Sequence, residues 1–206
     1  MRFVLVHMSC AGAWAWGEVP ARLREAGHEV LAPNLDLSPG QTPRSHADAI
    51  ATAAPGDGPV VVAGHSYGGM VVPALADRLR SRVRAVVVVD GLVPDPGDSS
   101  FAIRPHAAEE RRAAARAAGG VFPPPGDADP RLVPMPTSTF EAPVSFEALD
   151  VPRTFVWCTR SDMGAQAARA SARGWRVVEV DAGHRLPLED GALCTRLLLE
   201  APTAAG

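Results

Sequence analysis

Lysine is absent from this sequence of 206 residues, so all 20 of its basic residues are arginines. Enzymes that form a Schiff base, attach pyridoxal phosphate or hold phosphates in a P-loop need the primary amine of a lysine, and these classes are therefore excluded. Cysteine is also scarce. Cys10, Cys158 and Cys194 are odd in number and show no CxxC spacing, so we expect buried thiols rather than a disulfide framework or a zinc site.

Long apolar runs and concentrated charge of one sign are lacking too. The first apolar run, residues 3–6, is far too short for a signal-peptide core or a membrane span, and we therefore expect a cytoplasmic protein without a membrane partner. The formal net charge is −3, with no basic face that could bind nucleic acid. The expected partner is a small-molecule substrate. The oligomeric state stays open, with a homodimer as one alternative.

Short apolar runs alternate with amphipathic stretches along the chain. The runs predict strands at residues 3–6, 30–32, 60–63, 85–89, 154–157 and 177–180. The stretches predict helices at residues 19–26, 45–54, 69–79, 163–172 and 188–199, with Ser45 as an N-cap and Pro55 as a helix stop. Runs that are apolar on both faces suit parallel strands covered by helices on both sides. The pattern predicts a single α/β domain, residues 1–206, with a doubly wound sheet of about six strands.

The segment from about residue 95 to 150 breaks this alternation, because it contains no strand-like run. Residues 104–118 are rich in Ala, Arg and Glu, which predicts a helix. Residues 121–143 are dense in proline, Pro125 and Pro136 among them, and this argues against a regular helix or a central strand. A long irregular insertion in a compact domain usually has a function. We expect a short lid over the active site.

The strongest local signal is the motif Gly64-His65-Ser66-Tyr67-Gly68, which fits G-x-S-x-G. It follows an expected strand and precedes an expected helix, which is the context that a nucleophilic serine requires. A tight turn exposes the serine hydroxyl above the sheet, and the flanking glycines let strand and helix approach each other closely. The sequence therefore predicts that Ser66 is a nucleophile.

A nucleophilic serine needs a base and an acid that orients it. His184 follows the last expected strand, at the same edge of the sheet as Ser66, and is the expected base. Asp162 follows the strand at 154–157 and is the expected acid, with Asp90, directly after the strand at 85–89, as the alternative. The oxyanion formed during acyl transfer would accept hydrogen bonds from two backbone N–H groups, those of Tyr67 and Ser9.

Several segments together resemble the plant methylesterase and hydroxynitrile lyase group of the α/β-hydrolase superfamily and its bacterial esterase-like relatives. They are residues 4–16, 27–35, 89–94, 132–143, 154–162 and 183–184. The resemblance implies an α/β-hydrolase fold, a triad of Ser66, Asp162 and His184, an oxyanion hole at Ser9 and Tyr67, and neither a cofactor nor a metal.

Three positions depart from the family pattern. The esterases usually carry glycine where this chain has Met8, so a long thioether is expected to narrow the substrate pocket. Bacterial relatives often place the acid directly after Thr-Arg, whereas Ser161 intervenes here before Asp162. Arg185 stands where the cyanohydrin-cleaving relatives have lysine, and Met8 where they have threonine, so lyase chemistry is not expected.

The function that these residues favour is hydrolysis of a carboxylic ester or a related acyl bond through an acyl-enzyme. Two alternatives remain open at this point. One is a biosynthetic enzyme that uses the same triad for acyl transfer or lactone formation, which differs in the exclusion of water. The other is a receptor-like protein that binds a small molecule. Rapid turnover of p-nitrophenyl acetate would argue against the receptor.

Overall fold

A six-stranded parallel sheet forms the centre of the computed structural model, which describes residues 1–54, 56–124 and 129–201. The strand order is β2-β1-β3-β4-β7-β8. The strands are β1 (Arg2–Val6), β2 (Glu29–Leu31), β3 (Val60–His65), β4 (Val83–Val89), β7 (Arg153–Cys158) and β8 (Arg176–Val180). All six coincide with expected strands, and the predicted doubly wound α/β-hydrolase fold is confirmed.

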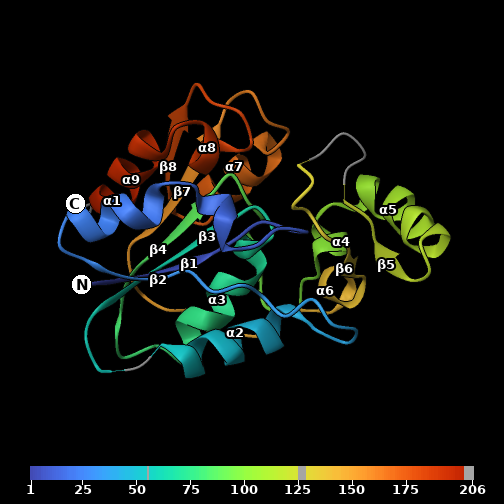
Figure 1. Cartoon of the computed structure of the whole chain (residues 1–206), viewed down its shortest axis with the longest axis horizontal. Coiled ribbons are helices and arrows are strands. Elements are labelled where there is room, and N and C mark those ends of the chain that lie inside the picture. Colours follow the sequence, from blue (N-terminus) through green and yellow to red (C-terminus); the bar gives the residue numbers. More distant parts are fainter. Residues whose placement is uncertain (55, 125–128, 202–206) are drawn as a thin grey trace.

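Helices cover both faces of the sheet (Figure 1). On one face, α1 (Val19–Glu25) and α9 (Gly191–Glu200) share a core with Phe3 and Leu5 of β1. On the other face, α2 (Pro43–Ala53) and α3 (Gly68–Arg78) share a core with Val4 and Val6. Alternate side chains of one strand thus enter opposite cores, which explains why the strands are apolar throughout. The helix α7 (Gly164–Ser171) packs against β4 and β7.

Two helix boundaries differ from the prediction. Thr42, and not Ser45, is the N-cap of α2. Its side chain accepts a hydrogen bond from the Ser45 N–H, and the Ser45 hydroxyl oxygen accepts one from the Thr42 N–H, which completes a capping box. The predicted last helix is divided into α8 (Leu186–Glu189) and α9, because Asp190 leaves helical geometry and caps α9 through the Leu193 N–H. Pro55, the expected helix stop, lies outside the described residues.

The segment between β4 and β7 contains a separate group of short elements, which we call the cap (residues 99–144). It lies beyond the carboxyl ends of the central strands (Figure 1). Its elements are α4 (Ser100–Ile103), α5 (Pro105–Ala117), β5 (Val121–Phe122), β6 (Met135–Pro136) and the single turn α6 (Ser138–Glu141). The helix expected at 104–118 is therefore confirmed as α5. Between residues 121 and 143, the short β5–β6 ribbon and α6 are the only regular structure among the described residues, and Pro125 lies outside them.

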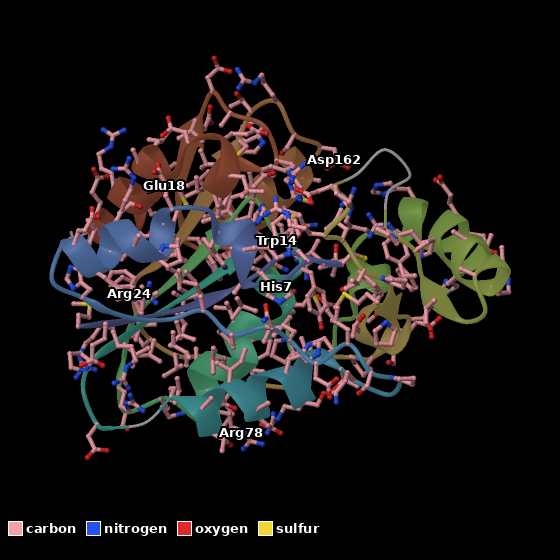
Figure 2. All side chains as sticks on the ribbon, in the orientation of Figure 1. His7, Trp14, Glu18, Arg24, Arg78 and Asp162 are labelled. Atoms are coloured by element: carbon pink, nitrogen blue, oxygen red, sulfur yellow. The ribbon has the colours of Figure 1, made fainter. Side chains whose placement is uncertain are left out.

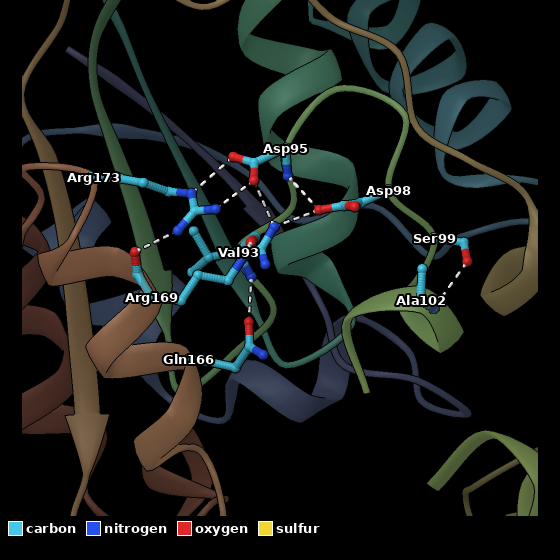
Figure 3. Close-up of polar contacts among 8 residues, drawn as sticks. All are labelled: Val93, Asp95, Asp98, Ser99, Ala102, Gln166, Arg169 and Arg173. Atoms are coloured by element: carbon cyan, nitrogen blue, oxygen red, sulfur yellow. Dashed lines mark hydrogen bonds and ion pairs between the residues drawn. The ribbon is translucent and has the colours of Figure 1, made fainter. Parts of the chain in front are cut away.

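The two ends of the cap are tied to each other and to α7. The Val144 N–H donates to the Asp98 carbonyl, and the Gly97 N–H donates to the Val144 carbonyl, each at 2.8 Å. Arg169 of α7 bridges Asp95 and Asp98, and Arg173 makes a bidentate pair with Asp95 (Figure 3). This network fixes where the cap leaves the sheet.

Across the described residues, no helix has the length and apolar character to cross a membrane.

Candidate active site

Ser66 lies in the sharp turn between β3 and α3, at the carboxyl edge of the sheet. Its φ is +55°, in the left-handed region that non-glycine residues rarely adopt. Glycine is required on both sides of this turn. A Cβ on Gly64 would lie 2.5 Å from the backbone carbonyl group of Gly68, and a Cβ on Gly68 would overlap the carbonyl oxygen of Val6. These contacts explain why the motif has a glycine two residues before Ser66 and another two residues after it.

His184 lies between β8 and α8, with its ring between Ser66 and Asp90. Its Nε2 is 3.0 Å from the Ser66 Oγ, and its Nδ1 donates to the Asp90 Oδ2 at 2.6 Å. The Asp90 side chain is completely buried, whereas that of His184 is 34% exposed. The structure thus brings together a hydroxyl, an imidazole and a carboxylate in the order that general-base activation of a serine requires.

The expectation that Asp162 contacts His184 is corrected by this geometry. Asp162 follows β7 as expected, but its side chain is 71% exposed and forms an ion pair with Arg104 at 2.5 Å. Figure 2 shows Asp162 at the rim of the sheet domain, on the side that faces the cap. The inward position after β7 is taken by Ser161, whose hydroxyl reaches Asp90. The alternative carboxylate, Asp90, is the partner of His184.

Asp90 is held by three hydrogen bonds to its side chain. One oxygen accepts from the imidazole, and the other accepts from the Cys158 N–H at 3.0 Å and from the Ser161 hydroxyl at 2.9 Å. Its φ of +43° turns the chain sharply at the end of β4. No role for Ser161 was predicted from the sequence. The sequence feature that could have indicated this role is the hydroxyl residue directly before Asp162, at the carboxyl end of β7, the strand next to β4.

Two buried histidines support the loops around this site. The His7 Nδ1 donates to the Met8 carbonyl at 2.8 Å, and its Nε2 accepts from the Leu35 N–H at 3.1 Å. The His65 Nε2 donates to the His184 carbonyl at 2.7 Å, next to the ring that contacts Ser66. Burial lowers the pKa of His7 to about 4 and that of His65 to about 3, so both are neutral at pH 7.

These two histidines are expected to make the protein less stable as the pH falls from 7 to 5. Their pKa values in the folded protein lie below the value of about 6.5 in the unfolded chain, so the unfolded chain takes up protons that the folded protein does not. The expected loss is about 2 kcal/mol for each histidine. Urea denaturation at both pH values measures it, and His7→Gln should reduce the loss. A free energy of unfolding that is equal at pH 7 and pH 5 would contradict this prediction.

The two expected oxyanion donors belong to residues that line one pocket with Ser66. Tyr67 directly precedes α3, and Ser9 lies in the loop after β1; both line the same pocket as Ser66. Neither backbone N–H donates a hydrogen bond to another described residue. The first turn of α3 also carries the positive end of the helix dipole. The geometry is therefore compatible with a negatively charged oxygen bound at these two N–H groups.

The pocket above Ser66 has a volume of about 440 Å³. Its lining includes Ser66, His184, Met8 and Ser9. The cap contributes apolar walls from Phe122, Leu132 and Phe140, together with arginine side chains. Met8 lines this pocket as expected and is itself largely buried, packed in one cluster with Ala11 and Ala15. Within the described ranges, no group of three or more His, Cys, Asp or Glu side chains is arranged to hold a metal ion.

Comparison with known proteins identifies the family. Residues 3–196 match the family described as the alpha/beta hydrolase family. The chain belongs to the alpha/beta hydrolase family. This membership agrees with the fold, the serine turn between β3 and α3, and the position of His184 after β8.

Curated relatives of the chain include esterases. A carbendazim hydrolyzing esterase from Nocardioides sp. (strain SG-4G) is 37% identical over 116 residues, which are 51% of this chain and 48% of that protein. Methylesterase 8 from Arabidopsis thaliana is 37% identical over 110 residues, which are 47% of this chain and 40% of that protein. The chain thus matches less than half the length of each of these relatives.

Solved structures of alpha/beta hydrolases superpose over nearly the whole chain. An extracellular alpha/beta-hydrolase from a Paenibacillus species has a TM-score of 0.86 and 19% sequence identity, with 98% of both chains covered. At this level of identity the likeness shows the fold alone. The α/β-hydrolase fold and the resemblance to the methylesterase group are therefore confirmed.

Proposed function

We propose that this protein is a serine esterase that cleaves small carboxylic esters through an acyl-enzyme. The observation that carries the proposal is the contact of His184 with both the Ser66 hydroxyl and the buried Asp90 carboxylate. The esterases among its curated relatives support the same type of reaction. The pocket of about 440 Å³ suits a small substrate.

In the proposed first step, the Ser66 Oγ attacks the ester carbonyl carbon while the His184 Nε2 accepts the hydroxyl proton. Asp90 accepts the hydrogen bond from Nδ1, which keeps the imidazole in the tautomer with a free Nε2 lone pair and stabilises the cation that forms. Ser161 and the Cys158 N–H hold the carboxylate in the position that this contact requires.

The carbonyl oxygen becomes an anion in the tetrahedral intermediate, and the N–H groups of Ser9 and Tyr67 are its proposed donors. The intermediate collapses when the bond to the alcohol oxygen breaks and His184 returns the proton to that oxygen. Water then repeats the sequence on the acyl-Ser66, with His184 again as the base, and releases the acid.

Turnover of p-nitrophenyl acetate tests the proposed reaction. The purified chain should release p-nitrophenol continuously, with an initial burst wherever deacylation is slower than acylation. Methyl and ethyl esters of short acids should be cleaved as well, which would separate a true esterase from a protein that reacts only with an activated ester. Failure to hydrolyse any member of such a panel would contradict the proposed function.

Met8 is proposed to limit the size of the group next to the ester carbonyl, because its unbranched side chain occupies space that glycine would leave empty. Met8→Gly is expected to raise kcat/KM for branched and aromatic esters by about tenfold relative to acetate esters. Met8→Leu preserves the side-chain volume and should preserve the wild-type ranking. The measurement is a panel of short, branched and aromatic esters on the three proteins. An identical ranking for Met8→Gly would show that this residue does not restrict the pocket.

A further inference from the structure

Positively charged side chains form part of the lining of the pocket above Ser66. Arg104, Arg111 and Arg185 line it, and Asp162 is the acidic side chain that lines it with them. Arg104 forms an ion pair with Asp162 at 2.5 Å, and Arg185 lies 3.7 Å from Asp129. Two of the three guanidinium groups therefore have a carboxylate of the protein close by.

Arg111 differs from these two arginines. It projects from α5 and is partly buried, with its guanidinium carbon 5.4 Å from the ring centroid of Phe122. It makes no hydrogen bond or ion pair with any residue in the part of the chain that the structure describes. Burial and the neighbouring Arg104 lower its pKa, yet a guanidinium remains protonated at neutral pH. An uncompensated cation is thus held against an aromatic wall of the pocket.

Removing a charged group from water is unfavourable unless an opposite charge or hydrogen-bond acceptors compensate for it. The other ionisable groups that influence Arg111 do not compensate for its charge in this way. Asp162 is already engaged by Arg104, Glu110 is exposed on α5, and burial raises the pKa of the Cys10 thiol to about 12, which leaves it neutral. The unused donors of Arg111 are therefore available to a ligand in the pocket.

We propose that Arg111 binds an anionic group of the substrate, so that the preferred substrates are esters that carry a free carboxylate, such as monoesters of short dicarboxylic acids. This inference rests on the proposed esterase function. Both arms of such a molecule would share one pocket of about 440 Å³, with the ester carbonyl at Ser66 and the carboxylate at the cap. A planar guanidinium can donate two parallel hydrogen bonds to the two oxygens of a carboxylate, and this geometry favours a carboxylate as the bound anion.

The direct test compares monoethyl glutarate with ethyl pentanoate, in which a methyl group replaces the carboxylate. The wild-type protein should show the higher kcat/KM for the anionic ester. Arg111→Gln should lower the ratio of the two kcat/KM values by about ten- to a hundredfold, the size expected for a charge-assisted hydrogen bond, and Arg111→Lys should retain part of it.

Arg112→Gln is the matched control for this test. Arg112 is the next residue of α5 and also lies over an aromatic ring, that of Phe101 at 4.8 Å. It is paired with Glu141 at 3.3 Å and is not part of the pocket lining. Its substitution removes the same charge from the same helix, so the wild-type ratio of kcat/KM values should persist. An equal loss in both variants would overturn the proposal, because it would reflect the overall charge of the cap.

Binding of glutarate to Ser66→Ala, measured by calorimetry, separates this inference from the esterase function. Binding that Arg111→Gln weakens at least tenfold supports the anion site even if no ester is hydrolysed, in which case only the esterase proposal fails. The opposite outcome has two parts: neutral esters are hydrolysed as well as the anionic one, and glutarate binding does not depend on Arg111. This outcome overturns the anion site and leaves the esterase proposal in place.

Discussion

Asp90→Asn is expected to reduce kcat for ester hydrolysis by about 10⁴-fold while the protein stays folded. Asparagine has nearly the same shape, but its amide presents a donor or a weaker acceptor to the His184 Nδ1, which now makes a 2.6 Å contact with a fully buried carboxylate. The imidazole would then favour the tautomer that carries a proton on Nε2, and that nitrogen could no longer accept the Ser66 proton. Steady-state kinetics on p-nitrophenyl acetate gives the magnitude.

Asp162→Asn is the matched control, because it makes the same chemical change at the carboxylate that was predicted from the sequence to be the acid of the triad. Its side chain is 71% exposed and is paired with Arg104, not with His184. We expect a change in kcat of less than about tenfold, the range of an exposed ion pair. Circular dichroism spectra of both variants exclude unfolding as the cause. A larger loss in Asp162→Asn than in Asp90→Asn, with both proteins folded, would contradict the assignment of the acid.

Ser66→Ala is expected to reduce turnover by about 10⁵-fold or more, because the acyl group then has no oxygen to which it can be transferred. Alanine adopts the φ of +55° at this turn at a cost similar to that of serine, so the elbow should persist and the thermal midpoint should change little. The same p-nitrophenyl acetate assay measures the loss. Turnover near the wild-type rate would mean that the hydrolysis does not pass through Ser66.

The turn at Ser66 was predictable from sequence because all its determinants are local. The glycines at 64 and 68, the apolar strand before them and the helix after them lie within a few residues. His184 was also predictable, since parallel strands place their carboxyl ends at one edge, where a histidine after β8 meets a serine after β3.

The acid was not predictable by the same reasoning. Asp90 and Asp162 follow β4 and β7, which are neighbours in the sheet, so strand order alone cannot separate them. What separates them is the path of the chain after β7, where Ser161 turns inward to Asp90 and Asp162 stays at the rim. This path depends on contacts between residues about seventy positions apart in the sequence, such as that of Ser161 with Asp90.

The cap, too, was predictable from the sequence only in part. Its helix α5 was predictable from composition, but the packing of Phe101 and Phe122 against Phe140 joins residues far apart in the sequence. The position of Arg111 over Phe122, inside the pocket, follows from that packing. A run rich in alanine and arginine indicates a helix, and only the fold determines which of its arginines is turned toward the serine.

Labelling with a serine-reactive phosphonate tests the central claim most directly, because it reports the reactivity of the serine without a choice of substrate. The claim is that Ser66 is activated by His184, which is held by Asp90. We predict that peptide mapping by mass spectrometry finds one phosphonyl group per chain, on the peptide that contains Ser66, and that Asp90→Asn is labelled far more slowly than the wild-type protein. Labelling at another residue, no labelling of the folded protein, or an equal rate in Asp90→Asn would contradict the claim.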